Sequence, residues 1–270
     1  TKFIVPLLAV LLAACSSSTS TSSDSGTDGG VTSVRMYATP SPATAPVMMA
    51  GAKTFTTDLG DTITINKAYL VIWSTTIETA CDDSFSAGLR ELLRNPLDLI
   101  VPPAYAHTTP TPTSTGEPHV INILAMDDNP VAIGSMSPSV ADYCGVDVDF
   151  IAADEDALDL PEGAGEPDMI GRTVYIEASF QQTGANGGMS GDFVIDTGVT
   201  LINRKMLLSS LMMISAASPT ASVTIGINYD RWFDSIDLVQ LDVETDAATD
   251  PNDDQVFQLL QNITASLHHI

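Results

Sequence analysis

Two histidines near a segment rich in proline and threonine are the residues of this chain best suited to bind a metal ion. His107 and His119 are twelve residues apart, so a hairpin between them would bring two imidazole rings together. One prediction is therefore a metal site. The simpler interpretation, which we prefer, is a pair of solvated loop histidines. We expect the other two, His268 and His269, to be frayed unless neighbouring strands hold them.

An acidic segment near the C-terminus carries oxygen ligands of the kind that calcium prefers. Asp250, Asn252 and Asp254 occupy the first, third and fifth positions of a loop that resembles an EF-hand. The sixth and twelfth positions are both glutamine, where that loop has glycine and glutamate. The acidic run 153–160 also lacks a glycine that could form the loop. Weak calcium binding is one prediction, and solvated acidic faces are the interpretation we prefer.

The triplet Asp196-Thr197-Gly198 follows two apolar residues and resembles the active-site triplet of aspartic proteases. That resemblance implies two carboxylates that share one proton, hence a second triplet or a homodimer. The chain has no second triplet of this kind, and a turn between two strands explains the same residues. The segment GGMSG, 187–191, is not a Gly-x-Ser-x-Gly motif and reads as a loop. An aspartic-type hydrolase is therefore the third of our functional hypotheses, and we predict no enzyme.

The first of three cysteines ends an uncharged apolar run over residues 3–14. Twelve helical residues cover about 18 Å, against about 30 Å of bilayer hydrocarbon, so the run suits an export signal better than a membrane span. Leu12-Ala13-Ala14-Cys15 resembles the lipobox of bacterial lipoprotein signal peptides at all four positions. The resemblance implies a signal peptide over 1–14, cleavage before Cys15, and lipid attached to the Cys15 sulfur.

Lipid on Cys15 would leave Cys81 and Cys144 as an even pair in an oxidising compartment outside the cytoplasm. We predict a disulfide between them, which would contribute about 4 kcal/mol in the chain-entropy model. Two free buried thiols are the alternative.

The segment that follows Cys15 is a serine, threonine and glycine tract, 16–30, without an apolar residue. It cannot bury enough surface to fold, so we expect a tether that holds a domain off the membrane. The formal net charge is -24, from 34 acidic and 10 basic residues. A field of that sign repels nucleic acid, whereas a cation or a basic envelope protein would fit it. Ser16 in place of aspartate favours the outer membrane of a Gram-negative bacterium.

Residues 31–270 have the composition of a single mainly β domain. Segments rich in Ile, Val, Thr and Tyr, several with period-two alternation, predict strands. They are 62–79, 118–124, 145–151, 173–180, 191–198, 199–208 and 221–230. Helical spacing of apolar residues predicts a short internal helix over 84–95 and a C-terminal helix over 253–269. We expect an antiparallel β-sandwich, interrupted by a proline- and threonine-rich loop at 95–118.

The segment NYDRWFDSIDL, 228–238, followed by an acidic stretch and a last helix, resembles the closing segment of MbnP-like periplasmic proteins. That family is β-rich and associated with copper. No binding residue is carried over from it, and we expect both Trp73 and Trp232 to lie in the core.

Together these features predict a lipid-anchored cell-envelope protein that binds a partner or ligand, or has a structural role, without catalysis. The alternative is a periplasmic lipoprotein that handles copper or calcium through His107, His119 and the acidic loops. Its oligomeric state does not follow from the sequence.

Overall fold

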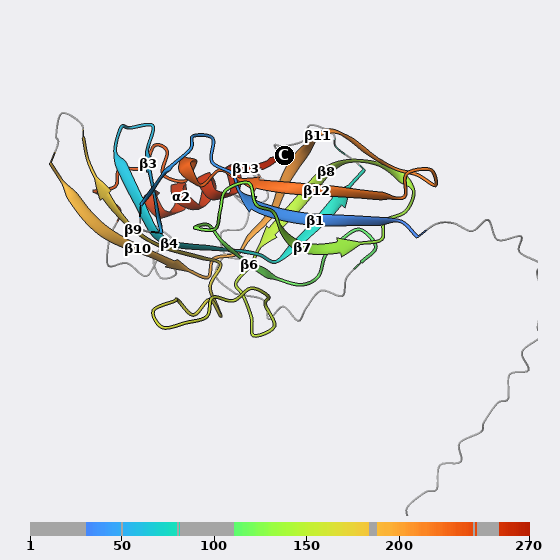
Figure 1. Cartoon of the computed structure of the whole chain (residues 1–270), viewed down its shortest axis with the longest axis horizontal. Coiled ribbons are helices and arrows are strands. Elements are labelled where there is room, and N and C mark those ends of the chain that lie inside the picture. Colours follow the sequence, from blue (N-terminus) through green and yellow to red (C-terminus); the bar gives the residue numbers. More distant parts are fainter. Residues whose placement is uncertain are drawn as a thin grey trace, which may run out of the picture.

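The computed structural model describes residues 31–49, 51–79, 81, 111–183, 188–239, 241 and 254–270 (Figure 1). Several sequence predictions lie outside these residues: the lipobox with Cys15, the tether 16–30, the helix over 84–95, the loop at 95–118 up to residue 110, His107, Asp250 and Asn252.

The described residues are mainly β, as predicted. Their strands are β1 (Ser33–Pro40), β2 (Val47–Met49), β3 (Ala52–Thr56), β4 (Thr62–Ile72), β5 (Ser74–Glu78), β6 (His119–Asn122), β7 (Val131–Met136), β8 (Ala141–Phe150), β9 (Val174–Gln181), β10 (Ser190–Thr197), β11 (Leu201–Ile214), β12 (Thr220–Ile227) and β13 (Leu267–His269). The helices are the 3-10 turn η1 (Tyr229–Arg231) and the α-helix α2 (Asp254–Ala265).

The strands form three sheets that share one hydrophobic core. The first has the order β13-β12-β1-β7, the second β10-β9-β4-β3-β2 with β6 also paired to β4, and the third β11-β8-β5. Inward side chains of all three sheets and of α2 belong to the same buried cluster. In Figure 1 the strands of the first and third sheets occupy one end of the domain, and α2 lies towards the other.

One strand pair differs from the antiparallel arrangement that we predicted. β1 runs parallel to β12, with Ser33 opposite Thr220 and Pro40 opposite Ile227. Parallel neighbours need a long crossover connection, and here almost the whole domain separates the two strands in sequence. Because β1 also pairs with β7, it is enclosed on both sides. This closure joins the first and last parts of the domain.

The strands follow period-two alternation. In β1 the side chains of Val34, Met36 and Ala38 are buried, whereas Ser33 and Arg35 point to the other face and are half-buried or exposed. One face of the sheet therefore contributes to the core and the other faces solvent.

The C-terminal helix is shorter than predicted. The apolar stripe Val256, Leu259, Leu260 and Ile263 is buried, as its spacing predicts. However, α2 ends at Ala265 and the chain continues as β13, which pairs with β12. The prediction of a helix to residue 269 was wrong because Leu267–His269 form backbone hydrogen bonds with the open edge of β12 in place of another helical turn.

A second, smaller core lies on the outer face of β4 and β9. Residues 151–173 cross this face and pack Ala153, Ala157 and Met169 against Tyr69 and Val71. Within the described part of the chain, no helix is long and apolar enough to cross a bilayer.

Candidate functional site

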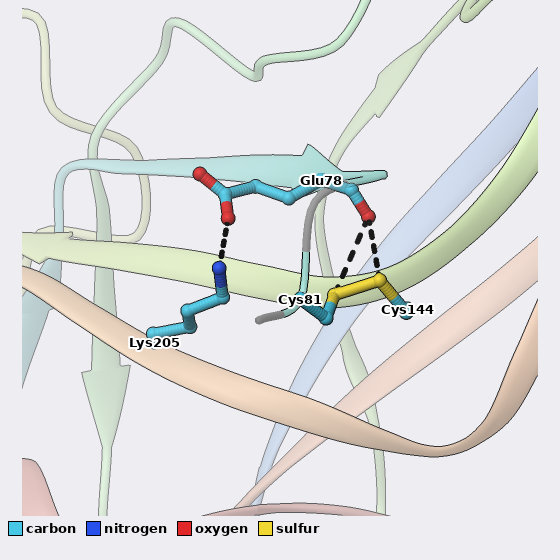
Figure 2. Close-up of a disulfide and its surroundings, with 4 residues drawn as sticks. All are labelled: Glu78, Cys81, Cys144 and Lys205. Carbon is cyan, nitrogen blue, oxygen red and sulfur yellow. Dashed lines mark hydrogen bonds and ion pairs between the residues drawn. A yellow bond between two sulfur atoms is a disulfide. The ribbon is translucent and has the colours of Figure 1, made fainter. Parts of the chain in front are cut away.

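Cys81 and Cys144 form a disulfide bond, with their Cα atoms 5.9 Å apart (Figure 2). The bond ties the end of β5 to the adjoining strand β8. The carbonyl oxygen of Glu78 lies 3.6 Å from the Cys144 sulfur and 3.9 Å from the Cys81 sulfur. Figure 2 shows the Glu78 side chain on the opposite side of its strand end, directed at Lys205. The even pair of cysteines is therefore structural.

A charged cluster lies beside this disulfide. The Lys205 ammonium is 2.5 Å from Glu78 Oε2, and Asp147 is opposite Lys205 in the β8–β11 register. Burial raises the pKa of Asp147 to about 7, and the neighbouring Glu78 carboxylate adds to the shift. A hydrogen bond from Asp147 and the charge of Lys205 lower the pKa of Glu78. The pKa values of these two neighbouring carboxyls are therefore shifted in opposite directions.

The expectation that His119 is a solvated loop histidine is wrong. His119 begins β6, is 6 % exposed, and its Nδ1 lies 3.0 Å from Asp159 Oδ2. Asp159 belongs to the acidic run 153–160 and has a φ of 61°. A β-bridge between His119 and Leu158 holds this run beside β6. The His119 ring therefore helps to hold residues 151–173 against the sheet. Among the residues that the structure describes, no group of three or more His, Cys, Asp or Glu side chains could hold a metal ion.

Asp254 is the N-terminal residue of α2, while the calcium-type positions before it lie outside the described residues. The pairing of β13 with β12 holds the two C-terminal histidines, which is the exception that the expectation of fraying allowed. His269 Nδ1 is 2.9 Å from the Ser209 hydroxyl. His268 lies opposite Gly226, where an added Cβ would be 2.4 Å from the imidazole.

The Asp-Thr-Gly triplet lies at a strand end. Asp196 accepts a hydrogen bond of 2.5 Å from Arg172 Nε, and β10 ends at the next residue, Thr197. A Cβ at Gly198 would be 2.4 Å from the carbonyl oxygen of Gly171, so only glycine fits there. Asp196 thus has a cation as its partner and not a second carboxylate. Trp73 and Trp232 are both buried, as predicted.

The outer face of the first sheet carries a row of polar side chains that the sequence analysis did not single out. In the paired strands, Arg35 on β1 lies between Ser135 on β7 and Ser222 on β12. One step along β1, Tyr37 lies between Ala132 and Thr224. Residues directly opposite each other in a sheet point to the same face. Arg35 and Tyr37 are therefore neighbours at the centre of this face.

Two open hollows adjoin each other over these side chains. The first has a volume of about 770 Å³ and is lined by Arg35, Tyr37, Ser222 and Thr224 among others. The second, about 500 Å³, shares Arg35 and Tyr37 and extends over β7 to Glu117. We call the two hollows together the Arg35 groove. Concave surfaces of this size, with a few converging polar groups, are typical of ligand sites.

The second hollow depends on close packing between β7 and the segment 111–118. Gly134 has a φ of 137°, at the irregularity between Met36 and Tyr37 in the β1–β7 register. A Cβ there would be 2.6 Å from Cγ2 of Thr115. Thr115 is buried, and its hydroxyl accepts a hydrogen bond of 2.9 Å from the backbone N–H of Thr75. This end of the Arg35 groove is therefore closely packed and fixed by hydrogen bonding.

The side chains of Arg35, Tyr37, Ser222 and Thr224 in the Arg35 groove have no hydrogen-bond partner in the described part of the chain. Elsewhere in the described residues Lys53, Lys67, Arg172 and Lys205 pair with carboxylates. Arg35 has no carboxylate partner in that part of the chain, and the hydroxyls of Tyr37, Ser222 and Thr224 make no hydrogen bond there. Arg231, on the 3-10 turn η1, is likewise exposed and without a carboxylate partner among the described residues, but it does not line either hollow. The donors of Arg35 are available to a ligand.

No family model, curated protein or solved structure matches this chain. The Arg35 groove is thus defined by its own geometry. Its residues left a signal that our predictions missed: 33–40 alternates between apolar and polar side chains, as the recognised strand over 221–230 does. The sequence contains no local signal for the pairing of β1 with β12.

Proposed function

We propose that this chain is a cell-envelope lipoprotein that binds a ligand without transforming it, through the Arg35 groove of a domain tethered to the membrane at Cys15. The observation that carries the proposal is the pair of adjoining hollows around Arg35 and Tyr37, two side chains without a hydrogen-bond partner among the described residues. Such a surface binds polar molecules from solution.

A binding role is favoured over hydrolysis by the surroundings of the strongest catalytic candidate. Asp196 forms an ion pair with Arg172, whose Nε lies 2.5 Å from Asp196 Oδ1. An aspartic-type reaction needs a carboxyl that shares a proton with a second carboxyl. Metal handling is the second hypothesis from the sequence. Its residues His107, Asp250 and Asn252 lie outside the described residues, so it stays a prediction.

The membrane attachment is tested by expressing the full chain, with its leader, in a Gram-negative host. Mass spectrometry of the detergent-extracted protein should find Cys15 as the acylated N-terminal residue. Cys15→Ser should leave an uncleaved leader without lipid. An unmodified Cys15 in the wild-type protein would contradict the anchoring part of the proposal.

The binding part is tested by site-specific photo-crosslinking. Benzoylphenylalanine replaces Tyr37 in the groove or, as a matched control, Val194 on the exposed face of β10. We expect irradiation of intact cells to give an adduct at position 37 that is absent at position 194, because only the groove holds a ligand. Equal labelling at both positions, or none at 37, would remove the groove as the binding site.

A further inference from the structure

The ligand class of the Arg35 groove follows from the arrangement of its side chains, and this inference rests on the proposed binding function. We propose that the groove binds an acidic sugar within a short oligosaccharide, with its carboxylate on Arg35 and its ring on Tyr37. The register of β1, β7 and β12 places the groups that such a ligand needs on one face.

The guanidinium selects the charged group of the ligand. Among the described residues that line the first hollow, Arg35 alone is charged, and its planar fork of donors fits a carboxylate with two parallel hydrogen bonds. A cation would be repelled at close range. A polyanion or a dianionic phosphate would be repelled by the net charge of -24, because the described groove has no second cation to compensate it. A ligand with one carboxylate satisfies both conditions.

The aromatic ring and the hydroxyls select a sugar. Tyr37 is two residues along β1 from Arg35, about 7 Å away, which is close to the width of one sugar ring with its carboxyl group. The Tyr37 ring offers an apolar face for the C–H groups of a pyranose. Ser222 and Thr224 lie one strand away on the same face, with hydroxyls free to donate and accept. A polyol matches these alternating donors and acceptors better than an apolar ligand would.

The second hollow limits how many acidic sugars the groove accepts. Glu117 lines it together with Arg35 and Tyr37, without an ion pair to Arg35. A second carboxylate would approach Glu117 and be repelled, whereas the hydroxyls of a neutral sugar can donate to it. The groove therefore favours a glycan in which an acidic residue adjoins a neutral one.

The test uses three disaccharides that differ in the number of carboxylates they carry. Cellobiouronic acid carries a carboxylate where cellobiose carries a hydroxymethyl group, and a disaccharide of two glucuronic acids carries two carboxylates. Binding to the full-length protein in detergent is measured by isothermal titration at low and at physiological salt. We expect saturable binding of cellobiouronic acid below about 1 mM, at least tenfold weaker binding of the other two, and weakening by salt.

Three variants assign the binding to the groove. Arg35→Met should weaken cellobiouronic acid at least tenfold and leave cellobiose unchanged, while Tyr37→Ala should weaken both sugars. Arg231→Met, which removes another exposed basic side chain, is the control and should change neither. Equal thermal unfolding of the variants shows that the fold is intact.

Two results would overturn the inference: no saturable binding of cellobiouronic acid, or binding that Arg35→Met leaves unchanged. Equal affinity for cellobiose would overturn the acidic class and indicate a neutral glycan. If crosslinking at position 37 succeeds while every sugar fails, the binding function stands and only the ligand class is wrong.

Discussion

The ammonium group of Lys53 lies 2.5 Å from Asp127 Oδ1, with its side chain 0 % exposed and that of Asp127 24 % exposed. Lys53 also donates to the carbonyl oxygens of Ile123 and Ala125, at 2.7 and 2.8 Å. The Tyr229 ring lies 4.5 Å from the same nitrogen and its hydroxyl donates to Asp127. Burial lowers the pKa of Lys53, and the Asp127 carboxylate opposes that shift. This network ties β3 to the turn after β6.

Lys53→Met should be strongly destabilising. The change removes one member of a buried ion pair and leaves two carbonyl oxygens and the Oδ1 atom of Asp127 without their donor. We expect the free energy of unfolding to fall by about 3 kcal/mol, measured by urea denaturation. Lys67→Met is the control, because Lys67 pairs with Glu177 at the surface. A variant at 53 that is as stable as the one at 67 would show that the buried pair contributes nothing.

Asp147 should make stability depend on pH. Its folded pKa of about 7 is above its ordinary value, so between about pH 4 and 7 the folded state holds a proton that the unfolded state has lost. Stability from this group is full at the acidic end of that window and is lost as the pH rises towards 7. The lowered pKa of Glu78 acts with the opposite sign, and only at more acidic pH.

Asp147→Asn removes this titration and should flatten the decline between pH 5 and pH 8. At pH 8 the variant should be more stable than the wild type by about 1 kcal/mol, since the site is only partly buried. NMR titration of the Asp147 carboxyl gives the pKa directly. In Glu78→Gln that pKa should move down but stay above its ordinary range, because burial is the larger cause. Identical pH profiles for wild type and Asp147→Asn would contradict the assignment.

The sequence predicted the strands with clear alternation, and it failed where long-range pairing decides the structure. The segments 145–151, 173–180 and 221–230 lie within or overlap β8, β9 and β12. Nothing local shows that β1 lies beside β12, because that contact depends on closure of the whole domain. The three residues of β13 continue a helical pattern and become a strand only because the edge of β12 is open to them.

In the candidate site, too, local patterns could be predicted from the sequence and long-range contacts could not. The pairing of Cys81 with Cys144 could be predicted without geometry, once Cys15 of the three cysteines is assigned to lipid attachment. His119 has no local signal for burial, since its partner Asp159 reaches it from a segment forty residues away. Arg35 and Tyr37 alternate with buried residues, which marks them as outward-facing. Their shared groove forms only when three strands from distant parts of the chain lie in register.

Loss of the disulfide should destabilise the domain. Cys81 and Cys144 are 63 residues apart, and in the chain-entropy model their bond contributes about 4 kcal/mol. We expect the double variant Cys81→Ser/Cys144→Ser to melt about 10 °C lower than the wild type, measured by circular dichroism. Cys15→Ser is the control, with no change in melting temperature. A double variant with wild-type stability would show that the bond constrains little in the unfolded chain.

Gly134→Ala should distort the Arg35 groove through Thr115. The added Cβ would be 2.6 Å from Cγ2 of Thr115 at a φ of 137°, so both the backbone and the contact are strained. We expect a loss of about 2 kcal/mol in the free energy of unfolding. Gly163→Ala separates the two causes, because its φ of 128° is similar and its nearest atom is 4.0 Å away. That variant should lose only the backbone part.

A rescue experiment isolates the contact itself. Thr115→Ser deletes the Cγ2 methyl group while keeping the hydroxyl that accepts from the Thr75 N–H. Combined with Gly134→Ala, it should recover part of the lost stability, and the amide resonances of Thr75 and Thr115 should return towards their wild-type positions in NMR spectra. If the double variant is no more stable than Gly134→Ala alone, the cost lies outside the Cγ2 contact, in the backbone or in the contact with the Thr115 Cβ at 3.0 Å. The Cγ2 methyl group of Thr115 would then have no part in shaping that end of the groove.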